Sequence, residues 1–470
     1  MFGFAEPGAQ VMVRFADQKK TATAGPEGKW KLRLDPLASS RSPRKLSIYD
    51  KKGTEIQTIQ DILVGDVWLC AGQSNMALMM NYYLKNSPDS PIVDVPNTRY
   101  LKLSKGDHEG PQDEVQTKKS WLALKNREIG ECSAVAYYFA DHWAKNSKVP
   151  LGLIIAAEGG KIVETFMSSE SLAALPSDIE VKATAKHNKP SLMYNPMIHP
   201  LHGTTIKGVI WYQAESNTFR NPLDYGVFFK AMITDWRDQW GRGNFPFLFV
   251  QLPSHAKPND MTGEIKAWVR DAQAQALELP NTYMAVTLDV GEYEGVHPYH
   301  KQPVGDRLAR IAEHLDGDQV LWNSPSYNRS EIEKDHLRIY FNGLAGKKLS
   351  TQRVVMNKTK DMPVGEDPDA FVMGADKLHG FEICGNDRQF ISAEAKIVSA
   401  NEVRVWSPSI SDPIAVRYGW ENFSLANLVG ADGLPAAPFR TDRFDPPDYE
   451  RLLIEMKEAE RQERLKKRKK

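Results

Sequence analysis

The stretch Trp68-Leu-Cys-Ala-Gly-Gln-Ser-Asn-Met76 ends an apolar run in a glycine turn that carries a serine. Ile62–Val64 and Val67–Cys70 are short runs of branched or aromatic residues, and such runs predict buried strands. Gly72 permits a sharp turn, so we expect Ser74 where the strand passes into a helix, with its hydroxyl above the edge of a sheet. A serine so placed can attack a carbonyl while backbone N–H groups at the start of the helix hold the oxyanion.

Two other segments offer partners for this serine, which by itself is more often a turn former than a nucleophile. In Gly208–Asn217 an apolar run again stops at polar side chains. These side chains include Gln213, Glu215 and Asn217. In Leu288–Pro298 a carboxylate, that of Glu294, lies three residues before His297. Such a short loop can hold a carboxylate and an imidazole within hydrogen-bond reach, as a serine-activating base requires.

With these segments in place, the chain resembles the sialate O-acetylesterase family of the SGNH/GDSL hydrolase superfamily. The matching pieces follow the family's order from about residue 60 to residue 310. They are Gly72–Met76, Gly159-Gly160 with Glu164 nearby, Trp211–Asn217, Phe247–Leu252 and Val296–Pro298. Each piece alone is weak evidence, whereas the ordered set is specific.

The resemblance implies a protein of the α/β class with a flavodoxin-like α/β/α parallel sheet. Its site would lie at the carboxyl ends of the strands, where open parallel sheets bind ligands. The alternation of strand and helix patterns between residues 61 and 324 independently favours βαβ units and a parallel sheet. The predicted strands are 151–155, 247–252 and 283–288, and the predicted helices begin near Cys132 or span 227–236 and 268–277.

By position, the resemblance makes Ser74 the nucleophile and His297 the general base. It implies an oxyanion hole made by the backbone N–H groups of Ser74 and of Gly160, or Gly159, with the side-chain amide of Gln213. It implies no metal and no organic cofactor.

The carboxylate that would orient His297 departs from the superfamily pattern, because Glu294 stands where aspartate is usual. Glu294 can still orient the imidazole, and Glu215 and Asp289 are alternatives. Glu215 is equally a candidate ion-pair partner for Arg270, and with Asn217 it is a candidate supporting residue. Ala214, Glu158 and Lys161 also differ from the family pattern, and the latter two bear on substrate preference.

His199 and His202 have metal-like spacing but no third ligand nearby, so we interpret them as structural histidines. Asn195 and Arg270 are expected either near the site or as residues that pin loops, and Trp211 as a residue of the core or of the pocket wall.

Strand patterns return on both sides of the catalytic region. We expect an N-terminal β-strand region over 1–60, a catalytic domain over 61–324, a C-terminal β-rich domain over 325–446 and a charged tail over 447–470. The two outer regions are expected to be β-sandwich-like, and the C-terminal one to pack with the N-terminal strands. Packing is a likelier role for it than sugar binding.

Composition excludes several classes of protein. The 470 residues include 60 basic and 60 acidic side chains, so no net field favours nucleic acid or an anionic membrane. Three cysteines make neither a disulfide framework nor a metal-ligand pattern. No stretch is apolar enough to cross a bilayer, and Met1–Gly8 lacks the features of a signal peptide. Relatives are often exported, so localisation stays open, as does the oligomeric state.

The resulting hypothesis is a serine esterase that removes O-acetyl groups from carbohydrates through an acetyl-Ser74 intermediate. O-acetylated sialic acids are the first expected substrate, and acetylated xylan or another polysaccharide is the alternative. A third hypothesis is a glycan-binding protein that does not hydrolyse its ligand.

Overall fold

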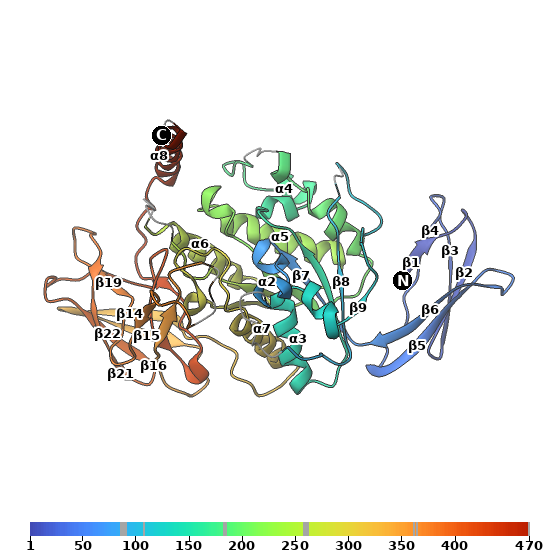
Figure 1. Ribbon diagram of the computed structural model, residues 1–470, viewed down its shortest axis with the longest axis horizontal. Helices are drawn as coiled ribbons and strands as arrows, with labels where there is room; N and C mark the ends of the chain where they lie inside the picture. The colour runs from blue at the N-terminus through green and yellow to red at the C-terminus, as the bar shows by residue number, and fades with distance from the viewer. Residues whose placement is uncertain are drawn as a thin grey trace.

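The computed structural model describes residues 1–84, 92–106, 109–181, 186–256, 263–360, 362 and 365–468. Three parts follow one another across the molecule: an N-terminal β region, a central α/β region and a C-terminal β region (Figure 1). The central part carries the predicted catalytic residues.

A seven-stranded sheet forms the middle of the central part. Its order is β13-β12-β11-β7-β10-β8-β9, and all neighbours are parallel except β8 and β9. The strands are β13 Thr282–Ala285, β12 Phe247–Val250, β11 Gly208–Tyr212, β7 Asp66–Gly72, β10 Leu151–Ala157, β8 Thr98–Lys102 and β9 Leu122–Ala123. This confirms the predicted α/β class and the parallel sheet.

Helices cover both faces of this sheet, which explains why β7 is apolar from Val67 onward. Trp68 and Cys70 point into one core, with α3 (Ala134–Asn146) and α7 (Gln302–Leu315). Leu69 and Ala71 point into the other, with α5 (Tyr225–Trp240) and α6 (Ile265–Ala274). Successive strand residues alternate between faces, so a strand covered on both sides has no polar face.

The N-terminal region is a separate sheet of order β3-β2-β5-β6, with a short β1–β4 pair beside it. Its strands are β1 Phe2–Phe4, β2 Gln10–Phe15, β3 Gln18–Thr23, β4 Lys29–Lys31, β5 Ser40–Tyr49 and β6 Glu55–Val64. The predicted strand at Ile62–Val64 exists, but it is the half-buried end of β6 and not a buried strand of the central sheet. Gly65 then leads into β7. A Cβ on Gly65 would lie 2.0 Å from the Pro150 carbonyl oxygen.

The C-terminal region packs two four-stranded sheets, β14-β15-β22-β21 and β20-β19-β23-β25, over a shared apolar core. Its strands are β14 Ser326–Glu333, β15 His336–Asn342, β16 Ser350–Thr351, β17 Val354–Met356, β18 Phe371–Met373, β19 Phe381–Cys384, β20 Ile391–Ser392, β21 Glu394–Ser399, β22 Glu402–Trp406, β23 Ala415–Tyr418, β24 Leu428–Val429 and β25 Phe439–Arg440. The region lies at the opposite end of the molecule from the N-terminal strands, so the expectation that the two pack together is wrong (Figure 1).

Arg270 of α6 joins the C-terminal region to the central one. It is fully buried, and its guanidinium donates to backbone carbonyl oxygens of both regions. The acceptors include those of Leu252 at 2.9 Å, Glu421 at 2.8 Å and Asn422 at 2.9 Å. Burial lowers the pKa of Arg270 to about 9. Arg270 therefore pins loops, as one of the two sequence interpretations held, and the proposed ion pair with Glu215 is wrong.

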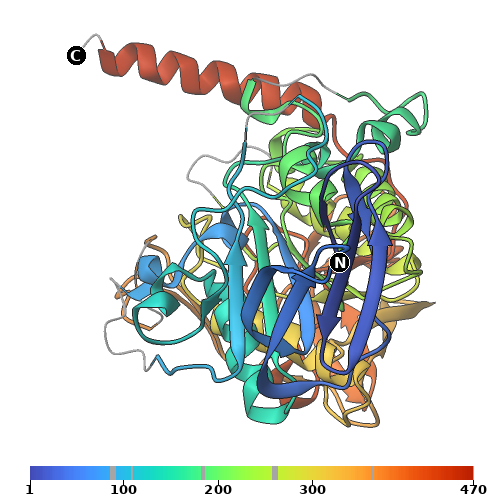
Figure 2. The same ribbon diagram turned by 90° about the vertical axis from the view of Figure 1, so that its right-hand side faces the viewer.

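The remaining helices are short or peripheral. They are α1 Ser74–Ala77, α2 Met80–Leu84, α4 Ser169–Ala173 and α8 Tyr449–Arg468. The charged tail forms α8, which extends away from the body of the molecule (Figure 2). Within the described ranges, every helix is too short or too polar to cross a membrane.

Candidate active site

The turn that presents Ser74 is built by close approach of β7 and β11. Gly72 has a φ of +135°, and a Cβ there would lie 2.2 Å from the Tyr212 carbonyl oxygen. The N–H of Gln73 donates to that same oxygen at 3.0 Å. Only glycine fits this conformation and spacing. The chain then enters α1 at Ser74, which is half-buried at the carboxyl edge of the sheet, as predicted.

Ser74 meets His297 across this edge, although 223 residues separate them. Nε2 of His297 lies 2.9 Å from Oγ of Ser74, a hydrogen-bond distance. The half-buried imidazole follows Val296 and precedes Pro298, which is buried. The two residues predicted to be nucleophile and base are therefore in contact.

Asn75 connects the serine turn to the histidine loop, a link that sequence analysis missed. Its side chain is 1 % exposed. Its Nδ2 donates to the carbonyl oxygen of Val296 at 3.0 Å and to Oε1 of Glu215. Because Asn75 adjoins Ser74 and Val296 adjoins His297, this one amide joins both loops. The sequence signal was the position of this amide directly after Ser74.

The three candidate orienting carboxylates lie in different surroundings. Glu294 is exposed, and its backbone N–H donates to the Lys358 carbonyl oxygen at 3.1 Å. The carboxylate of Asp289 accepts two hydrogen bonds of 2.7 Å from Arg307. Glu215 binds Asn75, and burial raises the pKa of its carboxyl group. Glu215 is thus linked through Asn75 to the serine turn and the histidine loop, whereas Asp289 is held in a bidentate ion pair.

The Gly159-Gly160 loop follows β10 and abuts the serine. A Cβ on Gly159 would lie 3.7 Å from Cβ of Ser74, and Gly160 has a φ of +71°. Both glycines are exposed. The N–H of Glu158 donates to the Gly72 carbonyl oxygen at 3.1 Å, which ties this loop to the serine turn.

A buried amide network holds the glycine loop from behind. Nε2 of Gln213 donates to Oδ1 of Asn217 at 2.7 Å and to the Lys161 carbonyl oxygen at 3.1 Å. Nδ2 of Asn217 donates to Oε2 of Glu164 at 3.0 Å, and burial raises the pKa of Glu164. Gln213 and Asn217 are 0 % exposed. In this geometry both residues support the loop.

The other residues considered in the sequence analysis contact backbone carbonyl groups or core side chains. Nδ1 of His199 lies 2.9 Å from the Gln112 carbonyl oxygen, and His202 packs against Trp240 with ring centroids 4.6 Å apart. Nδ2 of Asn195 donates to the Glu109 carbonyl oxygen at 3.2 Å, and Trp211 is fully buried in the core. Among the residues that the structure describes, no cluster of histidine, cysteine or acidic side chains is arranged to hold a metal ion.

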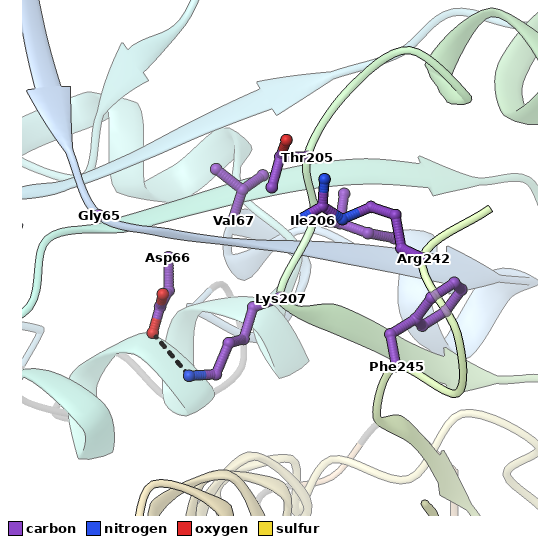
Figure 3. A pocket seen from close by; sticks show the side chains of 8 residues that line it. All are labelled: Gly65, Asp66, Val67, Thr205, Ile206, Lys207, Arg242 and Phe245. Atoms are coloured by element: carbon purple, nitrogen blue, oxygen red, sulfur yellow. Dashed lines mark ion pairs between the residues drawn. The ribbon is translucent and has the colours of Figure 1, made fainter. Parts of the chain in front are cut away.

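Two cavities lie at the other edge of the sheet, where the parallel strands begin. One, of about 320 Å³, is lined by residues of the β6–β7 junction and by the segments around Lys207 and Phe245 (Figure 3). Lys207 pairs there with Asp66 at 3.5 Å and with Asp316 at 2.6 Å. A neighbouring cavity of about 650 Å³ includes Trp121. Both are separated from Ser74 by the length of β7.

The doubly wound sheet, with a serine and a histidine in contact at its carboxyl edge, defines an α/β/α hydrolase of the SGNH type. A sequence model of the family described as "Carbohydrate esterase, sialic acid-specific acetylesterase" matches residues 64–312, more than half of the chain. The chain belongs to this family of carboxylic ester hydrolases.

Individual relatives extend the comparison. The chain is 31% identical over 343 residues to the sialate O-acetylesterase of Homo sapiens; the match covers 66% of this chain and 65% of that protein. The match to the Mus musculus enzyme of the same name has 28% identity and covers 93% of this chain and 90% of the relative. A carbohydrate acetylesterase from Xanthomonas citri has a similar solved structure. The TM-score is 0.80 at 32% identity, covering 94% of this chain and 95% of that one.

Proposed function

We propose that the protein is a serine esterase that removes O-acetyl groups from carbohydrates. The observation that carries the proposal is the 2.9 Å contact between Ser74 Oγ and His297 Nε2 at the carboxyl edge of the sheet. Family membership supports an ester as the substrate, and two exposed glycines beside Ser74 leave room for its acyl group.

The proposed reaction has two halves. His297 takes the proton of Ser74 as the hydroxyl oxygen attacks the acetyl carbonyl, and the sugar alcohol then leaves with a proton from the imidazole. Water attacks the acetyl-serine by the same route and releases acetate. Each half passes through a tetrahedral oxyanion that amide donors must stabilise.

For the oxyanion hole we propose the backbone N–H groups of Ser74 and of Gly160 or Gly159. The close approach of the glycine loop supports this assignment, because a Cβ on Gly159 would be in van der Waals contact with Cβ of Ser74. The amide of Gln213 donates to Asn217 and Lys161, so its predicted role as a third donor requires one of these bonds to open. Without such opening, Gln213 acts by holding the glycine loop.

Glu294 remains our proposed orienting group for His297, because both belong to one short loop. We expect Glu294→Gln to lower kcat by about a hundredfold with little change in stability, since the residue is exposed. Asp289→Asn is the control, because Arg307 already engages that carboxylate. Steady-state hydrolysis of a chromogenic acetate measures all variants. A larger loss for Glu215→Gln, in protein that still folds, would transfer the role to Glu215.

The substrate proposal names O-acetylated sialic acids first, because the family description and the mammalian relatives carry that specificity in their names. The Xanthomonas citri relative, called a carbohydrate acetylesterase, supports acetylated polysaccharides such as xylan as the second candidate.

A substrate panel tests this proposal. We expect free acetate and the deacetylated sugar from O-acetylated sialic acid at a higher kcat/KM than from acetylated xylan. Liquid chromatography of the products measures both. The reverse order would favour the polysaccharide. Binding of a glycan without turnover of any ester would instead indicate a non-hydrolytic glycan-binding protein.

A further inference from the structure

A lysine lies buried behind the serine turn, in a place that the proposed reaction does not use. Lys301 immediately precedes α7 and is only 1 % exposed. Its Nζ donates to Oδ1 of Asn75 at 2.5 Å. The ammonium also lies over two aromatic rings, 5.3 Å from the centroid of Tyr212 and 5.9 Å from that of Tyr83.

This contact decides which way the Asn75 amide points. An ammonium group can only donate hydrogen bonds, so it demands the oxygen of the amide. The NH2 group of Asn75 is then turned toward two acceptors, the carboxylate of Glu215 and the carbonyl oxygen of Val296. The reversed amide would place NH2 against the ammonium and the amide oxygen against a carboxylate. Lys301 therefore selects the orientation in which Asn75 joins the serine turn to the histidine loop.

We infer that Lys301 is a positioning residue that fixes the Asn75 amide and, through it, the hydrogen bond between Ser74 and His297. The inference rests on the proposed function, because it assigns the support of the proposed nucleophile and base.

The inference requires Lys301 in its protonated form, whose stability is set by two opposed effects. Burial lowers the pKa of Lys301 to about 7, and the charges on Glu215 and Glu292 raise it, so the ammonium that must donate to the Asn75 oxygen predominates below that pH. Burying an ammonium costs free energy unless partners compensate it. Part of that cost is offset by Asn75, two carboxylates and two tyrosine rings that converge from four separate segments of the chain. A methionine would fill the same space without that cost, but it could not orient the amide.

The test compares the rate and the extent of labelling of Ser74 by a fluorophosphonate, which reacts with an activated serine. In the full-length chain we expect Lys301→Met to label to the wild-type stoichiometry but tenfold to a hundredfold more slowly. With a chromogenic acetate, kcat should fall by a similar factor while KM changes little, because Lys301 does not touch the substrate. A merely structural role predicts the opposite signature: fewer labelled molecules, each reacting at the normal rate.

A double-mutant cycle with Asn75→Ala tests the route of the effect. Once Asn75 is removed, Lys301→Met should slow labelling further by less than twofold, since both changes break one linkage. Lys207→Met is the matched control at the opposite edge of the sheet and should label as the wild type does.

The outcomes separate the inference from the proposed function. Wild-type rates in a folded Lys301→Met variant, or in Asn75→Ala, would overturn the inference while leaving the esterase proposal intact. Absence of labelling at Ser74 in the wild-type protein would overturn both. Should Lys301→Met not fold, Lys301→Gln, which is neutral but can donate, must label more slowly than the wild type, or the inference is wrong.

Discussion

Ser74→Ala is expected to fold normally and to lose hydrolysis of a chromogenic acetate by about a thousandfold or more in kcat. The hydroxyl is the proposed nucleophile, and it lies 2.9 Å from the imidazole that would take its proton. The residue is half-buried at the end of a strand, so removing one oxygen leaves the core untouched. Circular dichroism and thermal unfolding check the fold, and initial rates measure the loss.

Ser147→Ala is the matched control for this change. Ser147 caps the end of α3, where its Oγ accepts a hydrogen bond from the Val149 N–H at 3.1 Å. We expect wild-type rates from this variant. Hydrolysis retained in a folded Ser74→Ala variant would show that another group attacks the ester, and the proposed function would have to be abandoned.

His297→Ala should lower kcat by a comparable factor, because the serine hydroxyl then has no base to take its proton. The imidazole is half-buried, so the truncation leaves space that opens toward solvent. Added imidazole should therefore restore part of the rate in a concentration-dependent way. Initial rates of acetate ester hydrolysis, measured with and without imidazole, provide the readout.

His314→Ala serves as the comparison for His297→Ala. His314 lies in the last turn of α7 and stacks on Trp322 with ring centroids 4.6 Å apart. Its loss should leave kcat unchanged, and imidazole should have no effect on that variant. Equal activity of His297→Ala and the wild type would remove His297 from the mechanism.

Much of the fold was predictable because β7 and its neighbours are apolar on both faces. The run 151–155 and the first four residues of 247–252 lack polar side chains, as strands covered on two sides must, and the structure places both in the central sheet. Ile62–Val64 has the same composition but lies in the half-buried end of β6. Composition alone could not separate the two cases, because the difference lies in what packs against each strand.

The site was predictable only in part, for a related physical reason. Ser74 and His297 lie in short motifs that can be recognised from the sequence alone. The structure brings the two side chains together. Lys301 lies in a polar stretch, where a lysine ordinarily signals a solvent-facing side chain. Only the three-dimensional arrangement buries it against Asn75. The carboxylates could not be ranked either, since sequence distance from His297 says nothing of burial.

The attachment of the C-terminal β region to the central region bears on how this protein could be engineered. Val286 and Leu288 belong to its apolar core, and Arg270 finds carbonyl acceptors at Glu421 and Asn422. A shortened chain ending at the border of the family match would leave the buried Arg270 guanidinium without its acceptors at Glu421 and Asn422 and would expose the apolar side chains of Val286 and Leu288. A fusion protein that carries the central α/β region should therefore include the C-terminal β region as well.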